Sequence, residues 1–304
     1  MIPPSENPSL IPSLTPFTPS VSVIVPAFNA VGTLKDCLDS LLTLDYPREK
    51  LEIIVVDNSS TDGTPDVLAG YRTLLKVYSE PVRGAGAARN HGLRRALHDI
   101  IAFTDADCVV DKDWLRNLVP PLIDPAVGIT GGKILSRRPC NRIERFGETI
   151  HDQGRVMQER LPTAATPNWA SRRATLFEVG LFDERFLRCQ DADLSYRLFL
   201  AGFRFVYTPK AVVYHRNASA LSGLFREGFR HGHGSVRFAR KHAKTLREFG
   251  RRRIYLSTYR ALGRNIKDLL IGDNRLSSVC FLTFNLGKKL GKLTGSIWFR
   301  YVDL

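Results

Sequence analysis

Two patterns of apolar residues alternate along the first half of the chain. Short apolar runs bounded by polar residues predict buried strands over residues 21–26, 51–57 and 100–103, and a shorter strand over 74–78. Between the first two runs, apolar residues recur at helical spacing in the series Leu34, Cys37, Leu38, Leu41 and Leu42. A helix is also expected over 86–98. This alternation predicts an α/β fold with a mostly parallel sheet and right-handed crossovers.

The alternation becomes less regular after residue 114. We expect a strand over 127–135, a polar helical segment around 142–158, helices over 175–179 and 191–201, and two strands over 203–207 and 212–214. From residue 218 onward, apolar residues alternate with Arg and Lys at helical spacing, which predicts two or three basic amphipathic helices. The predicted parts are an unpacked Pro-rich leader (1–20), an α/β domain (21–216) and a basic helical extension (217–304).

The net charge of +14 arises in the last part of the chain. Residues 216–304 contain 19 Lys and Arg against 5 Asp and Glu, whereas residues 1–215 contain 25 of each kind. A neutral body with a basic tail predicts an anionic partner, either a membrane surface or a nucleic acid.

The five cysteines lack the spacing of a zinc site, and residues 1–20 contain six prolines without a signal-peptide pattern. We therefore expect reduced thiols, a cytoplasmic location and no transmembrane helix.

Two carboxylates follow the strand predicted over 100–103. Asp105 and Asp107 would emerge at its carboxyl end, where open α/β sheets bind ligands. Two oxygen donors there suit Mg²⁺ or Mn²⁺ carrying a diphosphate, although a solvated turn is the simpler alternative. The Asp-x-Asp triplets at 111–113 and 191–193 precede helical patterns, where an aspartate is most simply a helix N-cap.

Five segments, in this order, resemble the family 2 glycosyltransferases of the GT-A fold. They are VSVIVPAFN (21–29), VVDNSSTDG (55–63), RGAGAARN (83–90), TDAD (104–107) and QDADLSYR (190–197). The resemblance covers about residues 20–216. It implies a GT-A-like sheet flanked by helices. It also implies inverting transfer of a sugar from a nucleotide-sugar, with a UDP-sugar as the expected donor, to a hydroxyl of a cell-envelope glycan or glycolipid.

The resemblance implies a nucleotide-sugar site at the ends of the first strands. Its residues would be Pro26, Ala27, Phe28, Asn29, Asp57, Gly86, Arg89, Asp105 and Ala106. A carboxylate such as Asp57 can accept hydrogen bonds from uracil or ribose, although it could equally cap the next helix. The glycine-rich segment would let the backbone approach a phosphate. It also imitates a dinucleotide-binding fingerprint, but it follows the third strand and has Arg89 at the last glycine position.

The resemblance further implies a metal site, a base and acceptor contacts. Asp107 would be the main ligand of an Mg²⁺ or Mn²⁺ ion, with Asp105 and His215 as further ligands, although a lone histidine at a strand end is more often structural. Asp191 would be the base that removes the proton of the acceptor hydroxyl, or else a helix cap. Contacts with the acceptor are expected at Gly132, Trp169 and Gln190, where Gln190 replaces an acid of the family pattern. Trp169 would offer its indole face to a sugar, or would belong to the core.

The basic extension leaves a second class of function open. Arg251–Arg253, Lys288, Lys289, Lys292 and Trp298 are interleaved with apolar residues, which suits an amphipathic helix on the anionic inner face of a cell membrane. Packing of charged helices on the α/β domain is the alternative, and nucleic acid is the less expected partner. The rival functions are a noncatalytic basic adaptor for membranes or nucleic acid and a dinucleotide-dependent enzyme.

Overall fold

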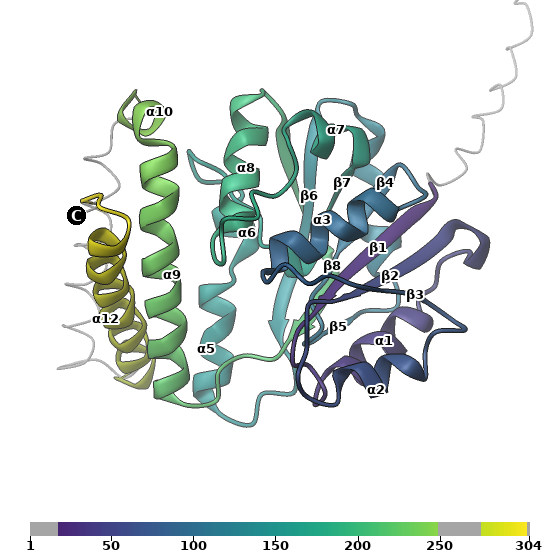
Figure 1. Cartoon of the computed structure of the whole chain (residues 1–304), viewed down its shortest axis with the longest axis horizontal. Coiled ribbons are helices and arrows are strands. Elements are labelled where there is room, and N and C mark those ends of the chain that lie inside the picture. The colour runs from purple at the N-terminus through teal and green to yellow at the C-terminus, as the bar shows by residue number, and fades with distance from the viewer. Residues whose placement is uncertain (1–17, 249–274, 303–304) are drawn as a thin grey trace, which may run out of the picture.

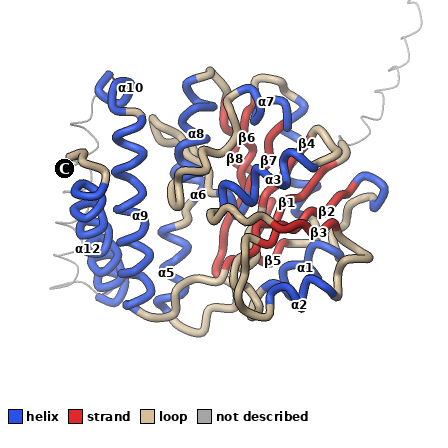
Figure 2. The backbone as a smooth tube through the Cα atoms, in the orientation of Figure 1, coloured by secondary structure: helices blue, strands red, loops and turns tan. Residues whose placement is uncertain are grey.

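The computed structural model describes residues 18–248 and 275–302. The predicted leader falls almost entirely outside these residues, and Arg251–Arg253 fall wholly outside them. The described residues form one sheet in the order β3-β2-β1-β4-β7-β6-β8-β5 (Figure 2). Its strands are β1 (Val21–Ala27), β2 (Leu51–Asp57), β3 (Lys76–Ser79), β4 (Ile100–Phe103), β5 (Cys108–Val110), β6 (Val127–Ser136), β7 (Trp169–Arg172) and β8 (Arg204–His215).

The first half of the sheet is parallel. β1 pairs in parallel with β2 and β4, and β2 pairs in parallel with β3, so the carboxyl ends of these strands lie at one edge. In the second half, β7 runs antiparallel to both β4 and β6, and β5 runs antiparallel to β8, whereas β6 and β8 are parallel. The α/β fold is confirmed, and the antiparallel strands are a feature that the sequence patterns did not predict.

Helices cover both faces of the sheet (Figure 1). Along β1, Val23 packs on one face and Ile24 on the other, and Val55 and Ile54 of β2 do the same. The first face is covered by α1 (Leu34–Leu42), α2 (Thr64–Ala69) and α4 (Trp114–Leu118), and the second by α3 (Ala85–Arg95), α7 (Arg173–Glu178) and α8 (Gln190–Leu200). Strands buried on both faces read as continuous apolar runs, which is why the sequence revealed them.

Two predicted elements differ from the structure. The strands expected over 203–207 and 212–214 are the single strand β8, because an irregularity in its pairing with β6 accommodates the residues between Thr208 and Val212. The helical segment expected around 142–158 is two helices, α5 (Arg142–Ile150) and α6 (Gln153–Val156). The break occurs at Asp152, whose carboxylate accepts a hydrogen bond of 3.1 Å from the backbone N–H of Arg155 and so caps α6.

The described part of the basic extension is helical. It forms α9 (Leu221–Lys241), α10 (Ala243–Glu248) and α12 (Arg275–Trp298). α9 and α12 lie side by side, because Gly228 and Gly232 of α9 and Gly287 and Gly291 of α12 each face the backbone of the other helix without space for a Cβ (Figure 1). Among the described helices, none has the length and apolar composition needed to cross a bilayer.

Candidate active site

The carboxyl ends of β1, β2 and β4 bring several predicted donor-binding residues together. Ala27 pairs with Asp57, and Asp105 lies just beyond β4, the strand that pairs with β1 on its other side. Phe28 is exposed immediately after β1, and the guanidinium carbon of Arg83 lies 4.6 Å from the centroid of its ring. This edge therefore presents a carboxylate, an aromatic ring and a cation, which are suitable groups for a nucleotide.

Two asparagines shape the loops at this edge. The side-chain oxygen of Asn29 accepts a 2.8 Å hydrogen bond from the backbone N–H of Thr61. Asn58 is buried, its amide donates to the carbonyl of Val82, and its oxygen accepts a 2.7 Å hydrogen bond from Gly84 N–H. Asn58 thus holds the glycine-rich segment at the start of α3. This role is not evident from the sequence, because residues 58–63 have the composition of an ordinary turn.

Arg89 differs from its predicted role. Its side chain is buried, its guanidinium Nη2 donates to Asp105 Oδ1 at 2.6 Å, and its guanidinium carbon lies 5.6 Å from the centroid of the Phe182 ring. Its Nε and Nη1 are buried without a partner among the described residues. In this conformation Arg89 fixes the orientation of Asp105 and does not reach outward to a phosphate. A charge-assisted bond of this kind orients a carboxylate firmly.

Asp107 and His215 meet where β5 pairs with the end of β8. His215 Nε2 lies 3.5 Å from Asp107 Oδ2, while His215 Nδ1 lies 2.7 Å from Asn217 Oδ1. Burial alone would lower the pKa of His215, but the negative charge of Asp107 raises it to about 9. Burial in turn would raise the pKa of Asp107, but His215 lowers it. The predicted pair of metal ligands is thus brought together, with Asn217 as an orienting partner that the sequence analysis did not identify.

The chemistry of these side chains fits a divalent cation. Donor atoms of Asp107, Cys108 and His215 all lie within 4.8 Å of one another. A carboxylate and an imidazole are suitable ligands for such an ion. Burial raises the pKa of the Cys108 thiol well above its usual range, so this side chain stays protonated and is a poor ligand. Of the three side chains, Asp107 and His215 are therefore the ones that could hold a divalent cation.

Asp191 occupies the first turn of α8. The N-cap position of this helix belongs to Cys189, which has a left-handed backbone with φ of 61°, so Asp191 is not the cap residue. The Asp191 carboxylate is half-buried and accepts a 2.8 Å hydrogen bond from the N–H of Ala192. In contrast, Asp193 is fully buried and has ion-pair partners. Of the two aspartates in this triplet, Asp191 is the one whose carboxylate remains available for chemistry.

The start of α8 lies next to the start of α3. A Cβ built on Gly86 in the first turn of α3 would lie 3.9 Å from the Cβ of Gln190. Gln190 is buried, and its side-chain oxygen has no hydrogen-bond partner among the described residues. Gly86, predicted to hold the donor phosphates, and Gln190, predicted to contact the acceptor, therefore lie side by side.

Trp169 and Gly132 do not fit their predicted role as acceptor contacts. Trp169 is fully buried, and its ring packs 5.0 Å from that of Phe103, so neither face is open to a sugar. Gly132 is buried in β6, where a Cβ would lie only 2.5 Å from the side-chain nitrogen of Asn168. Both residues therefore serve the packing of the sheet.

A group of side chains connects α9 to the pair formed by Asp107 and His215. The ring centroid of His151 in the turn after α5 lies 4.9 Å from that of His215, and His151 Nε2 lies 3.4 Å from Glu227 Oε1 of α9. Burial would raise the pKa of Glu227, but His151 lowers it and keeps the carboxylate charged. No local sequence signal linked these residues, because they lie far apart in the chain.

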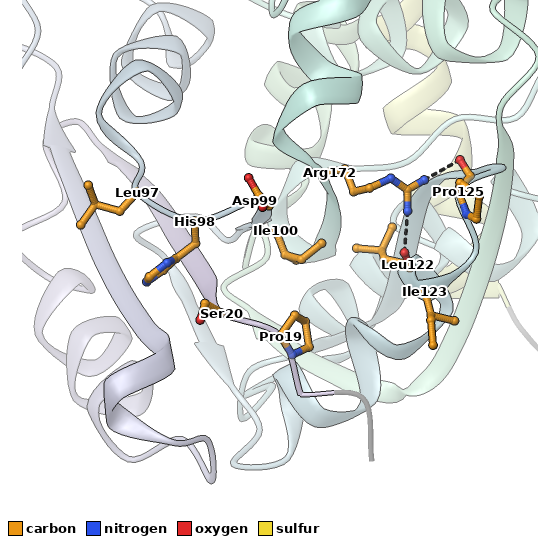
Figure 3. A pocket seen from close by; sticks show the side chains of 10 residues that line it. All are labelled: Pro19, Ser20, Leu97, His98, Asp99, Ile100, Leu122, Ile123, Pro125 and Arg172. Atoms are coloured by element: carbon orange, nitrogen blue, oxygen red, sulfur yellow. Dashed lines mark hydrogen bonds between the residues drawn. The ribbon is translucent and has the colours of Figure 1, made fainter. Parts of the chain in front are cut away.

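A pocket at the opposite edge of the sheet is unrelated to this chemistry. It lies at the amino ends of β1 and β4 and is lined in part by Ser20, His98, Asp99 and Arg172 (Figure 3). The guanidinium of Arg172 donates to the carbonyls of Leu122 and Pro125, so its charge is already used within the fold. Ligands of α/β sheets bind at the other edge.

The profile of the family described as Glycosyl transferase family 2 matches residues 22–180. The chain belongs to this family. It is a glycosyltransferase, and the family predicted from the five segments is confirmed. AglE, a glycosyltransferase of Haloferax volcanii, is 28% identical over 229 residues, which cover 73% of this chain and 75% of that protein. The pre-mycofactocin glycosyltransferase of Mycobacterium tuberculosis is 30% identical over 66% of this chain, but the match spans only 43% of its own length.

Solved structures with a similar fold confirm the GT-A-like architecture. The mannosyltransferase PcManGT from Pyrobaculum calidifontis, in complex with GDP-Man and Mn²⁺, is 24% identical with a TM-score of 0.68, over 93% of this chain and 88% of that chain. S. aureus TarS 1-349 in complex with UDP is 19% identical with a TM-score of 0.53, over 94% and 93% of the two chains. At these identities the likeness concerns the fold.

Proposed function

We propose that this glycosyltransferase transfers a sugar, with inversion, from a nucleotide-sugar to a hydroxyl of a glycan or glycolipid. The observation that carries the proposal is the pairing of Asp107 with His215, 3.5 Å apart. This pair lies at the edge of the sheet formed by the carboxyl ends of the parallel strands, where Asp57 and Asp105 also lie. Proteins of similar fold that contain GDP-Man with Mn²⁺, or UDP, support a nucleotide-sugar donor. We propose UDP as the nucleotide and GDP as its alternative.

The donor would bind across the ends of β1, β2 and β4. Pro26, Ala27, Phe28, Asn29 and Asp57 would hold the base and ribose, and Gly86 the diphosphate at the start of α3. Asp105 would reach the ribose or the cation in the orientation that Arg89 imposes. We propose Mn²⁺ over Mg²⁺ because the imidazole of His215 is a better ligand for manganese. The bound cation would offset negative charge on the departing nucleoside diphosphate.

Asp191 would be the base. As the acceptor hydroxyl oxygen bonds to the anomeric carbon, the bond from that carbon to the diphosphate oxygen breaks on the opposite face. The hydroxyl proton passes to the Asp191 carboxylate, and the nucleoside diphosphate leaves with the bonding electrons. Gln190 would contact the acceptor by hydrogen bonding without adding charge, since its buried side-chain oxygen has no partner among the described residues.

Binding of nucleotides tests this proposal directly. Isothermal titration with UDP and with GDP, each with and without Mn²⁺, should show cation-dependent binding of one of them. A panel of nucleotide-sugars, read by release of UDP or GDP, then identifies the donor. A noncatalytic basic adaptor would bind neither nucleotide in a cation-dependent way, and that result would overturn the proposal.

We also propose that residues 21–216 carry the catalytic site and that residues 217–304 dock the enzyme on an anionic membrane, at the cytoplasmic face. Leu286, Leu290, Leu293 and Ile297 recur at helical spacing along α12, and each is at least 41% exposed. Phe281, Leu282 and Phe284, nearer the start of the same helix, are partly buried. An apolar stripe beside lysines suits the interface of an anionic bilayer, and nucleic acid is the less expected partner.

A further inference from the structure

Four basic residues from three separate elements gather beside Asp191. This cluster, called here the acceptor-side cations, consists of Arg188 in the loop before α8, Arg226 and Arg230 of α9, and Lys288 of α12. Arg226, Arg230 and Gly234 are spaced four residues apart and so lie along one stripe of α9. A Cβ built on Gly234 would lie 2.9 Å from the Cβ of Arg188, which places the loop against that stripe.

Lys288 approaches the same region from α12. Its backbone lies against Gly228 and Gly232, on the face of α9 that meets α12, whereas Arg230 points from another face of α9. Arg188, Arg226 and Arg230 are near one another, because burial and the charges of Arg188 and Arg226 lower the pKa of Arg230. Burial and Asp191 raise the pKa of Cys189 to about 12, while Lys288 and Arg188 act to lower it. Arg188 and Lys288 therefore lie near Cys189, which precedes Gln190 and the proposed base Asp191.

Among the described residues, the acceptor-side cations have no carboxylate in direct contact, and the more distant Glu227 and Glu159 act on Arg230 and Lys288. Within residues 18–248 and 275–302, none of the four has a carboxylate at ion-pair distance. Basic side chains elsewhere in the site differ, since Arg89 pairs with Asp105 and Lys241 pairs with Asp193. Glu227, the acid between Arg226 and Arg230 in α9, is engaged by His151 at 3.4 Å. Like charges held close together are unfavourable and indicate a site that an anion completes.

The cluster adjoins the start of α8, where the acceptor would bind. The thiol of Cys189 donates to the carbonyl of His231 in α9 at 3.8 Å, and Gln190 and Asp191 follow directly in the chain. The charge on the donor diphosphate would be met separately, by the cation at Asp107 and His215. A second concentration of positive charge is therefore available to the other substrate.

We propose that the acceptor-side cations bind a phosphate ester carried by the acceptor and so align its hydroxyl with Asp191. A phosphate monoester has about −1.5 to −2 charge and three acceptor oxygens, which match several cations better than one carboxylate does. The planar guanidinium groups of Arg188 and Arg230 suit bidentate contact with phosphate oxygens. The phosphate could belong to a lipid or to a soluble glycan. This inference rests on the proposed function and names the acceptor class for the same site.

Binding of phosphate probes tests the inference. Isothermal titration would be run with the full chain saturated with UDP and Mn²⁺, using inorganic pyrophosphate, dodecyl phosphate below its micellar concentration, and dodecyl maltoside as a neutral probe. Wild type should bind at least one phosphate probe and not the maltoside. A double variant, Arg188→Gln with Arg230→Gln, should lose at least about tenfold in that affinity, because each charge-assisted hydrogen bond contributes substantially. Preference for dodecyl phosphate supports a lipid source, and equal binding of pyrophosphate supports a soluble one.

A matched control removes the same charge elsewhere. Lys244→Gln with Arg247→Gln changes two exposed cations of α10 and should leave phosphate binding within about twofold of wild type. Equal phosphate affinity in wild type and the Arg188/Arg230 variant would overturn the inference, as would binding of phosphate that occurs only without UDP. Normal Mn²⁺-dependent binding of UDP in that same experiment would show that the donor assignment survives. Loss of UDP binding by wild type would instead refute the proposed function.

Discussion

The imidazole of His215 lies 3.5 Å from the carboxylate of Asp107. Asp107 lies in the middle of the α/β domain and His215 at its end, and the antiparallel pairing of Cys108 with His215 between β5 and β8 brings them together. Because β5 begins immediately after Asp107, the strand pairing itself fixes this geometry.

Removing the Asp107 carboxylate should abolish cation-dependent binding of nucleotide. Asp107→Ala removes the charged oxygen ligand and leaves His215 alone, so the affinity for UDP in Mn²⁺ should fall to its cation-free value. Isothermal titration measures this directly. The matched control is Asp99→Ala. Asp99 is exposed and lies just before β4, at the edge of the sheet opposite to Asp107. Unchanged Mn²⁺ dependence in the Asp107 variant would remove Asp107 from the metal site.

Replacing Asp191 should separate catalysis from binding. Asp191→Asn keeps the shape of the side chain but cannot accept the proton of the acceptor, so kcat should fall by at least about 10²-fold. The affinity for UDP with Mn²⁺ should remain within about twofold. Turnover is measured by nucleotide release, with Glu178→Gln, an exposed substitution at the end of α7, as the control. Near-normal turnover of Asp191→Asn would disprove the assignment of the base.

Binding of Mn²⁺ should strengthen as pH rises from about 6.5 toward 9. The pKa of His215 is raised to about 9 by Asp107, so at neutral pH a cation must displace the proton on the imidazole. The affinity for Mn²⁺ should increase by up to about tenfold between pH 7 and pH 8. Titration of Mn²⁺ at these two pH values measures the change. His215→Gln should lose this dependence, and His98→Gln, at the opposite edge of the sheet, should keep it.

The same pair makes stability depend on pH in the absence of metal. Because the folded pKa of His215 is raised above its ordinary value of 6.5, the stabilisation is complete below about pH 6.5 and is lost as pH rises through about 9. Urea denaturation of the metal-free protein across this range should therefore show a decrease in the free energy of unfolding. An increase over the same range would contradict the ion pair.

Asp193 should be a major stabilising residue. It is fully buried, with Lys241 Nζ at 2.7 Å, His242 Nε2 at 2.8 Å and Arg197 Nη2 at 2.9 Å. Burial alone would raise the pKa of Asp193, but hydrogen bonds from His242 and Lys241 lower it, so its contribution is present above about pH 4 and is lost on further acidification. Asp193→Asn removes the buried counter-charge of Arg197 and one of the two carboxylates that pair with Lys241, the other being Asp183, and should reduce the free energy of unfolding by about 3 kcal/mol or more.

Urea denaturation measures the effect of Asp193→Asn. Asp66→Asn, an exposed aspartate of α2, should change the free energy of unfolding by less than about 0.5 kcal/mol. A similarly small change in Asp193→Asn would show that the join between α8 and α9 does not depend on this carboxylate.

Membrane docking should depend on both salt and the apolar stripe of α12. Sedimentation with anionic liposomes should fall as salt rises, because the screening length decreases from about 10 Å at 0.1 M to 3 Å at 1 M. Leu290→Gln with Leu293→Gln should weaken it further, since both side chains are exposed on the stripe. Single- and double-stranded oligonucleotides serve as competitors. Equal pelleting with neutral lipid, or preferential binding of an oligonucleotide, would refute the membrane proposal.

The sequence by itself determined the parallel half of the sheet and the residues at its edge. β1, β2 and β4 are buried on both faces, so their apolar runs and the polar residues that end them could be recognised without knowledge of their neighbours. Asp57, Asp105, Asp107 and Asp191 were identified for this reason and through the order of the five segments. The basic character of the tail was also visible, because charge is a property of composition.

Tertiary structure alone decided which residues share a space. Trp169 and Gly132 were expected at the acceptor, but burial in the core settled their roles, and burial depends on residues distant in sequence. Arg89 was expected in the nucleotide-sugar site, and the structure shows that it orients Asp105 there. The link from Glu227 through His151 to the metal site, and the gathering of cations beside Asp191, join elements far apart in the chain. These contacts depend on how α9 and α12 pack against the rest of the protein. The periodicity of apolar residues within one segment does not predict them.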